Sequence, residues 1–183
     1  MSTPPLVDNR KDVTGVTSTY QTVLLKDGNI WMAENYNYCA NEDLCQTYMG
    51  YRDFMEDNRK DGVGLYYEWS AFTPAALPPG WHVPTIEEWK TMVNCYGGIT
   101  NCYSALVKGG SSGLNLQLDG GTYFKNEGCR QLAMQGLGFY WSASEGDNTN
   151  FAALIMLDKD KTEASIKYIR KEYRFNVRLV KDK

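Results

Sequence analysis

The sequence predicts an α+β domain in which two helices pack on a small, twisted, mostly antiparallel sheet, with long irregular loops between the elements. Three observations predict this fold class: a helix with a clear start signal near the middle of the chain, four β-rich segments in the last third, and a long polar stretch before the helix. With 183 residues, the chain is long enough for one hydrophobic core. We expect residues 1–17 to form a flexible leader or tether and residues 18–183 to form a single domain.

The first half of the chain is expected to hold a hairpin and a short helix. Residues 20–25 and 30–32 are rich in β-forming side chains, and Asp27-Gly28 between them is a tight-turn signal. Residues 34–64 are polar and irregular, which is typical of a loop that carries function on a rigid scaffold. A short helix is expected at residues 65–72, before Pro74.

The second expected helix spans residues 86–96. Thr85 and Glu88 form a Thr-x-x-Glu capping box, which favours a helix start directly after Pro84. The helix is expected to end at Gly97-Gly98, where glycine tolerates the left-handed cap conformation.

The last third reads as strands at residues 139–144, 151–157, 165–169 and 175–180, with a turn at residues 158–161. Both alternating sets of side chains in residues 151–157 are apolar, so this strand is expected in the centre of the sheet, covered on both faces. We expect the strands near the two termini to pair as neighbours.

Composition disfavours several partners. The chain has 19 basic and 22 acidic residues and a net charge of −3, so it offers no electrostatic drive toward nucleic acid or anionic lipid. It has no run of about 18 apolar residues, so direct membrane insertion is not expected. Its first residues lack the basic and apolar regions of a secretion signal.

The five cysteines indicate an oxidising compartment. Cys39 and Cys45 flank one short polar loop, Cys95 and Cys102 flank another, and each pair is spaced for a disulfide. Cys129 is left over and is expected to be a buried, inert thiol. No Cys-x-x-Cys pair points to a metal site.

Catalytic side chains are scarce, so we expect no enzyme and no catalytic residue. His82 is the only histidine, and its position between Trp81 and Val83 predicts a buried structural ring that bonds a neighbouring group. The Gly-x-Ser-x-Gly pattern around Ser111 precedes a strand-like segment rather than a helix, so we treat it as chance.

No cofactor is expected, apart from a weak case for a structural calcium ion. Asp53, Asp57 and Asp61 supply several oxygens in one loop, although their spacing does not match an EF-hand.

Five ordered motifs carry a family resemblance. They are NIWMAENYNY (29–38), GLYYEWSAF (64–72), PPGWHVPTIEEW (78–89), GFYWSASE (138–145) and FNVRLVKD (175–182). Together they resemble the Fibrobacter succinogenes major paralogous domain family. The resemblance implies a C-type-lectin-like fold, shared with formylglycine-generating enzymes and with the variable proteins of diversity-generating retroelements.

The resemblance also implies a location and a set of ligand-binding residues. Family members resemble exported or lipid-anchored proteins, so we expect an extracytoplasmic or cell-surface protein whose native leader is absent from this sequence, with a phage particle as the alternative. In the retroelement proteins the C-terminal region presents the ligand surface. Carried over, the candidates are Ser142, Ser144, Glu145, Asp147, Asn148, Asn150, Tyr168, Arg170, Tyr173 and Arg174.

The aromatic residues fall into two expected groups. Tyr36, Tyr38, Tyr48 and Tyr51 alternate with polar residues in the long loop, a composition favoured in binding loops, although Tyr36 equally fits the core. The tryptophans all sit in apolar motifs and are expected in the core; they are Trp31, Trp69, Trp81, Trp89 and Trp141.

Three functional hypotheses follow. The first is a non-catalytic recognition module that binds a protein or glycan on a cell surface, as in adhesion. The second is a structural tip domain of a pilus or phage fibre. The third is an unusual enzyme of the formylglycine-generating superfamily, which the lack of a cysteine near the C-terminal motif disfavours. The sequence leaves the ligand and the oligomeric state open.

Overall fold

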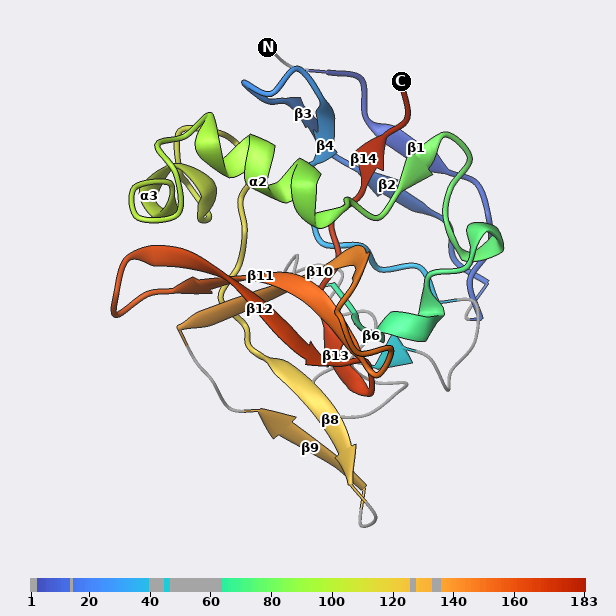
Figure 1. Cartoon of the computed structure of the whole chain (residues 1–183). Coiled ribbons are helices and arrows are strands. Elements are labelled where there is room, and N and C mark those ends of the chain that lie inside the picture. Colours follow the sequence, from blue (N-terminus) through green and yellow to red (C-terminus); the bar gives the residue numbers. More distant parts are fainter. Residues whose placement is uncertain (1–2, 14, 40–44, 47–63, 126–127, 133–135) are drawn as a thin grey trace.

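Several antiparallel sheets and two short α-helices make up the described part of the chain, as the computed structural model in Figure 1 shows. The structure describes residues 3–13, 15–39, 45–46, 64–125, 128–132 and 136–183, and for 45–46, 123–125 and 128–132 it describes the backbone only. The α+β class is confirmed. The expectation of one sheet is wrong, because many strands are only two or three residues long and separate sheets form around them.

The strands group into four sheets. The first pairs β1 (Leu6–Asp8) with β2 (Ser18–Tyr20). The second has the order β10 (Leu137–Glu145), β11 (Phe151–Asp158) and β12 (Glu163–Arg170). The third has the order β5 (Cys45–Gln46), β6 (Tyr66–Glu68), β13 (Tyr173–Phe175), β8 (Gly121–Lys125) and β9 (Gly128–Leu132). The fourth has the order β3 (Thr22–Leu24), β4 (Ile30–Met32), β14 (Val180–Lys181) and β7 (Trp81–His82).

The C-terminal segment joins two of these sheets. β13 lies between β6 and β8, and β14 lies between β4 and β7. The expected pairing of the terminal strands is wrong in detail: Val180 of β14 pairs with Trp31 of β4, the second strand of the expected hairpin, and not with the first strand, β3. The single strand expected at residues 175–180 is instead interrupted between β13 and β14.

Arg178 sits in that interruption and is fully buried. Its guanidinium donates hydrogen bonds to Asn35 Oδ1 at 2.7 Å and to the carbonyls of Met32, Leu114 and Asn115 at 3.2, 2.8 and 2.7 Å. Burial lowers the pKa of Arg178, although the neighbouring Tyr140 acts in the opposite direction. This side chain therefore adds to the backbone bonds that Val177 and Leu179 make with residues 32–36, and it ties the C-terminal segment to the irregular segment at Leu114 and Asn115.

The β10–β11–β12 sheet has a separate hydrophobic cluster on each face. Ala153, Ile155 and Leu157 of β11 pack on the helix side, and Ala152 and Leu154 pack on the side of Trp141 and Phe175. β11 is therefore the central strand with both faces covered, as expected from its sequence. In Figure 1 helix α2 (Ile86–Asn94) crosses above this sheet, and the β8–β9 hairpin extends below it.

Helix α2 begins as the sequence predicts. The Thr85 hydroxyl accepts a hydrogen bond from the Glu88 amide at 3.2 Å, and the Glu88 carboxylate accepts one from the Thr85 amide at 2.8 Å, which completes the capping box. The helix ends at Asn94, and Gly97 and Gly98 both have positive φ angles, 98° and 77°.

One other expectation about the elements is wrong. Residues 65–72 form β6 and a 3-10 turn, η1 (Trp69–Ala71), because Tyr66, Tyr67 and Glu68 pair with neighbouring strands instead of forming helical bonds. Three further elements were not predicted from the sequence. They are a second turn, η2 (Pro74–Ala76), helix α3 (Tyr103–Leu106) and the β8–β9 hairpin, which occupies a glycine-rich stretch.

The expected flexible leader is also wrong for the described part of residues 3–17. β1 pairs along its length with β2, and Asp8 is buried. Arg10 bonds Asp8 at 2.6 Å and the Tyr36 hydroxyl at 2.8 Å, and its guanidinium lies 4.1 Å from the Tyr38 ring centroid. These long-range contacts hold the segment against the domain despite its polar composition.

Trp31, Trp81, Trp89 and Trp141 are buried, as predicted. Trp69 is only partly buried, so its assignment to the core is wrong; its indole N–H donates to the Ser142 carbonyl at 2.8 Å and its ring faces Lys171. Tyr36 is a core residue, and Tyr48 and Tyr51 lie outside the described residues.

Candidate functional site

The candidate site lies where the C-terminal end of β12 and the start of β13 meet the β10–β11 turn. The ten residues that the sequence singles out come from these elements. They separate into two groups, one that stabilises the framework and one that is available at the surface.

Ser142 and Ser144 both make hydrogen bonds within the framework. The burial of Ser142 contradicts its assignment to a ligand surface, whereas Ser144 is partly exposed and its assignment stays a prediction. Ser142 is fully buried and donates to the Ala153 carbonyl at 2.7 Å, across an irregularity in the β10–β11 pairing. The Ser144 hydroxyl accepts a hydrogen bond from the Ile86 amide at 2.9 Å, and so caps the first turn of α2. Both hydroxyls satisfy groups that the strand and helix leave open.

Arg174 also belongs to the framework. It is only 3% exposed, and its Nη2 lies 2.8 Å from Glu68 Oε1 across the β13–β6 pairing. A second hydrogen bond, from Nε to the same oxygen, is 3.2 Å long. Because its guanidinium is buried and paired, the expectation that Arg174 lies on the ligand surface is wrong.

Four of the candidates lie at the β10–β11 turn and are exposed: Glu145, Asp147, Asn148 and Asn150. Asn148 closes the turn, because its side-chain oxygen accepts the Asn150 amide at 2.9 Å and its carbonyl accepts the Phe151 amide at 2.9 Å. Glu145 pairs with Lys171 at 2.6 Å. The turn is therefore a shaped, polar edge of the site.

Tyr168, Arg170 and Tyr173 come together at a cavity of about 380 Å³, which we call the aromatic pocket. Its wall contains Phe139, Phe151, Tyr168, Arg170, Tyr173 and Phe175. Tyr173 stacks on Phe175 with 6.0 Å between ring centroids, and Phe175 stacks on Phe139 at 4.8 Å. The pocket thus has a rigid aromatic side that continues into the core.

Charged groups surround this pocket. Arg170 is exposed and lies 3.4 Å from Glu172, a contact between two exposed side chains that contributes little to stability. Lys171 lies 4.0 Å from the centroid of the Trp69 ring and also holds Glu145. Arg170 is consequently free to turn toward a ligand, while Lys171 is held in place by two neighbours.

Four lining residues were missed by the sequence reasoning: Phe139, Phe151, Ile169 and Phe175. Each reads as an ordinary strand residue. Only the pairing of Phe151 with Arg170 across β11 and β12 shows that this ring belongs to the same end of the sheet.

His82 differs from the expectation of a buried ring, because its side chain is 35% exposed. Nδ1 lies 2.6 Å from Asp182 Oδ1, and Nε2 lies 3.0 Å from Glu88 Oε1. Burial alone would lower the pKa of His82, but the hydrogen bonds to Asp182 and Glu88 raise it. The ring is a bridge between α2 and the C-terminus, with both nitrogens engaged by carboxylates, which does not suit a general base.

Cys95 and Cys102 are free thiols, so the expected disulfide between them is wrong in this structure. Cys95 is exposed at the end of α2, whereas Cys102 is buried in the cluster beneath that helix, and burial raises the pKa of its thiol. Cys39 is buried and disulfide-bonded, and its partner is not among the described side chains. The Cys45 and Cys129 side chains lie outside the described residues, so the Cys39–Cys45 pair and the Cys129 thiol stay predictions.

In the described part of the chain, no cluster of three or more His, Cys, Asp or Glu side chains is arranged to hold a metal ion. The calcium candidates Asp53, Asp57 and Asp61 fall outside that part. Among the helices that the structure describes, none is long and apolar enough to cross a bilayer.

The fold and the site together define a small α+β domain that presents an aromatic pocket beside a polar turn. A family model, the Fibrobacter succinogenes major domain, matches residues 27–181. The chain belongs to this family, as its motifs predict. Comparisons with curated proteins and with solved structures gave no significant match.

Proposed function

We propose that this protein is a non-catalytic recognition module that binds a glycan at the aromatic pocket. The observation that carries the proposal is the pairing of a stacked aromatic wall with hydrogen-bonding groups at its edge. A sugar ring has an apolar face of C–H groups, which packs on an aromatic side chain, and hydroxyls that need donors and acceptors. Tyr173 would supply the aromatic ring for the C–H face of the sugar, and Arg170 with the Asn148 turn would supply the hydrogen-bonding groups for its hydroxyls.

The rigidity of the surroundings supports this proposal. The pocket wall continues through Phe175 into the core, and the polar turn is fixed by Asn148 and by the Glu145–Lys171 pair. A preformed site loses less conformational entropy when a ligand binds than a flexible loop does. The cavity of about 380 Å³ is at the small end of the range for ligand sites.

The finer fold assignment is part of the proposal. We infer a C-type-lectin-like arrangement, supported by the pairing of β14 with β4, which brings the C-terminal strand beside the β3–β4 hairpin. A location on a cell surface or phage particle, with a protein as the alternative ligand, fits the same picture. The non-catalytic assignment is supported by His82, whose ring nitrogens both face carboxylates.

The test is a glycan array probed with the full chain, together with three variants. Tyr173→Ala removes the stacking ring, Tyr173→Phe keeps it, and Lys108→Ala changes an exposed charge that is not part of the pocket wall. We expect selective binding to a few sugars, lost in Tyr173→Ala and kept in the other two. A blank array at high protein concentration, or binding that Tyr173→Ala leaves unchanged, would count against the proposal.

A further inference from the structure

We propose that a second surface, the groove between α2 and β12, binds an extended peptide that adds as a strand to the outer edge of β12. An apolar side chain of that peptide would enter the cavity between Val93 and Ile166. This inference goes beyond the proposed glycan site, because the cavity in this groove shares no lining residue with the aromatic pocket.

The outer edge of β12 offers backbone groups for pairing. β12 is the last strand of its sheet and pairs only with β11 among the described strands. The Ala164 amide already points outward, since it donates to the Ile99 carbonyl at 2.8 Å. Backbone groups of every second residue point to the same edge, so those of Ile166, Tyr168 and Arg170 also point outward. The Ile99 contact is therefore the first bond of a ladder that a peptide can continue.

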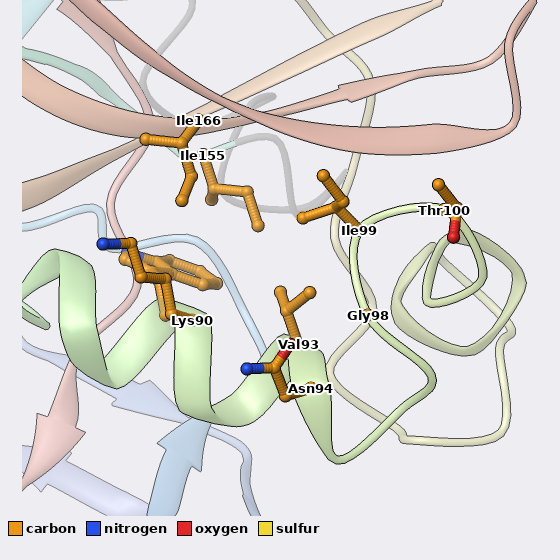
Figure 2. Close-up of a pocket in the computed structure, with 9 residues that line it drawn as sticks. Lys90, Val93, Asn94, Gly98, Ile99, Thr100, Ile155 and Ile166 are labelled. Carbon is orange, nitrogen blue, oxygen red and sulfur yellow. The ribbon is translucent and has the colours of Figure 1, made fainter.

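An apolar cavity lies beside this edge. It has a volume of about 400 Å³, and Figure 2 shows Ile155 and Ile166 reaching down from the strands toward Val93 of α2, with Ile99 at one end. Trp89 and Ile155 form a fully buried floor, whereas Ile99 is 49% exposed. Such a cavity gives one side chain of an added strand a specific place to bind.

The cavity exists because α2 covers only part of the sheet. The buried side of α2 packs on Tyr140 of β10 and on Ala153 and Ile155 of β11. Along β12 on the same face, exposure rises from 2% at Ala164 to 54% at Tyr168. The helix therefore covers Ala164 but leaves the side chains of the edge strand increasingly exposed from Ile166 to Tyr168.

The charges favour a peptide with acidic residues next to its apolar anchor. Between Ala164 and Lys171 the chain carries Lys167, Arg170 and Lys171 and no acidic residue, and of these Arg170 and Lys171 already contact Glu172 and Glu145 outside the stretch. Lys90 stands on the facing side of the groove, paired with Glu87 at 2.6 Å. The same cationic edge disfavours a second copy of this chain, because two such edges would repel each other.

The test uses a library of random eight-residue peptides screened against the immobilised full chain, with affinity then measured by fluorescence anisotropy on the enriched sequences. We expect peptides with one large apolar residue flanked by Asp or Glu. In hydrogen exchange, bound peptide should slow the amides of Ile166 and Tyr168. The screen overturns the proposal if it enriches no sequence over an unrelated immobilised protein.

Two substitutions at one position separate the backbone contribution from that of the side chain. Tyr168→Thr removes the ring and keeps the amide, whereas Tyr168→Pro also removes an outward amide that β11 does not use. We expect Tyr168→Pro to bind the peptide at least about fivefold more weakly than Tyr168→Thr, the effect of one hydrogen bond. Equal affinities would contradict strand addition.

A third substitution tests the cavity. Ile166→Asp places a negative charge among the apolar lining and should abolish binding of the acidic peptide, while Lys167→Glu should weaken it through charge alone. Peptide binding that survives Ile166→Asp would overturn the cavity assignment. Self-association of the wild-type chain that Tyr168→Pro removes would show a second copy as the occupant and would overturn the peptide proposal. Because the Tyr173 variants probe the aromatic pocket, failure of either site leaves the other independently tested.

Discussion

The surroundings of Arg178 and the aromatic pocket use the same kinds of residue for opposite purposes. Around Arg178 a charged group is fully buried, and the acceptors of its guanidinium hydrogen bonds are uncharged side-chain and carbonyl oxygens of the protein itself. At the pocket, Arg170 is exposed and its contact to Glu172 is long. The comparison teaches that residue type does not distinguish a framework residue from a binding residue, whereas the number of internal partners does.

The largest expected effect is on the framework. Arg178→Met removes the donor to the carbonyls of Met32, Leu114 and Asn115, and the hydrogen bonds to the first two are buried. We expect a loss of about 3–5 kcal/mol in the free energy of unfolding, measured by urea denaturation. The matched change Arg170→Met should cost less than about 0.5 kcal/mol. Equal losses for the two arginines would erase the distinction between the regions.

A smaller framework effect is expected at Ser142. Ser142→Ala leaves the buried Ala153 carbonyl without its 2.7 Å hydrogen bond, so we expect a loss of about 1–2 kcal/mol in unfolding free energy. Asn148→Ala, in the exposed turn of the same hairpin, serves as the control and should lose less. A neutral Ser142→Ala would show that this hydrogen bond does not stabilise the framework.

Next in size is the cap of α2. Thr85→Ala removes one half of the capping box and should lower the unfolding free energy by about 1 kcal/mol. Thr85→Ser keeps a hydroxyl acceptor and should retain most of it. If both variants lose the same amount, the methyl group rather than the cap is responsible.

The smallest effect is a pH dependence from His82. Its pKa is raised in the folded protein, so it stabilises the fold below its unfolded value of about 6.5 and loses that contribution as the pH rises through the folded pKa. The pKa of Glu88 is lowered, net of burial, by the Thr85 and His82 hydrogen bonds, so its contribution is lost as the pH falls below about 4.5. Because His82 is 35% exposed, solvent screening keeps the effect small.

The measurement is the unfolding free energy of the wild type and of His82→Gln between pH 5 and pH 9. The wild type should lose its advantage over the variant as the pH rises above about 6.5. A difference between the two proteins that stays constant over this range would show that the bridge to Asp182 and Glu88 does not depend on ring protonation.

The sequence predicted the parts of the fold that depend on local patterns. The capping box at Thr85, the hairpin with its turn at Gly28, and the central place of β11 follow from short-range chemistry and are confirmed. It missed the division into several sheets and the docking of residues 3–17, because both depend on contacts between distant segments, such as Arg10 with Tyr36.

The sequence predicted where the candidate site lies better than it predicted which residues form the site. Tyr168, Arg170 and Tyr173 do meet at one cavity, but Ser142 and Arg174 are structural. Polarity alone cannot show that a serine faces a carbonyl across a strand irregularity, or that an arginine has a glutamate opposite. The aromatic lining was missed for the complementary reason, since a phenylalanine in a strand reads as core wherever it points.

The most direct test of the glycan site is backbone NMR of the labelled chain titrated with the sugar that the array selects. The account predicts the largest chemical-shift changes at Phe151, Tyr168, Arg170 and Tyr173, with little change around Arg178. Changes centred elsewhere in the chain, or no saturable change at all, would contradict it.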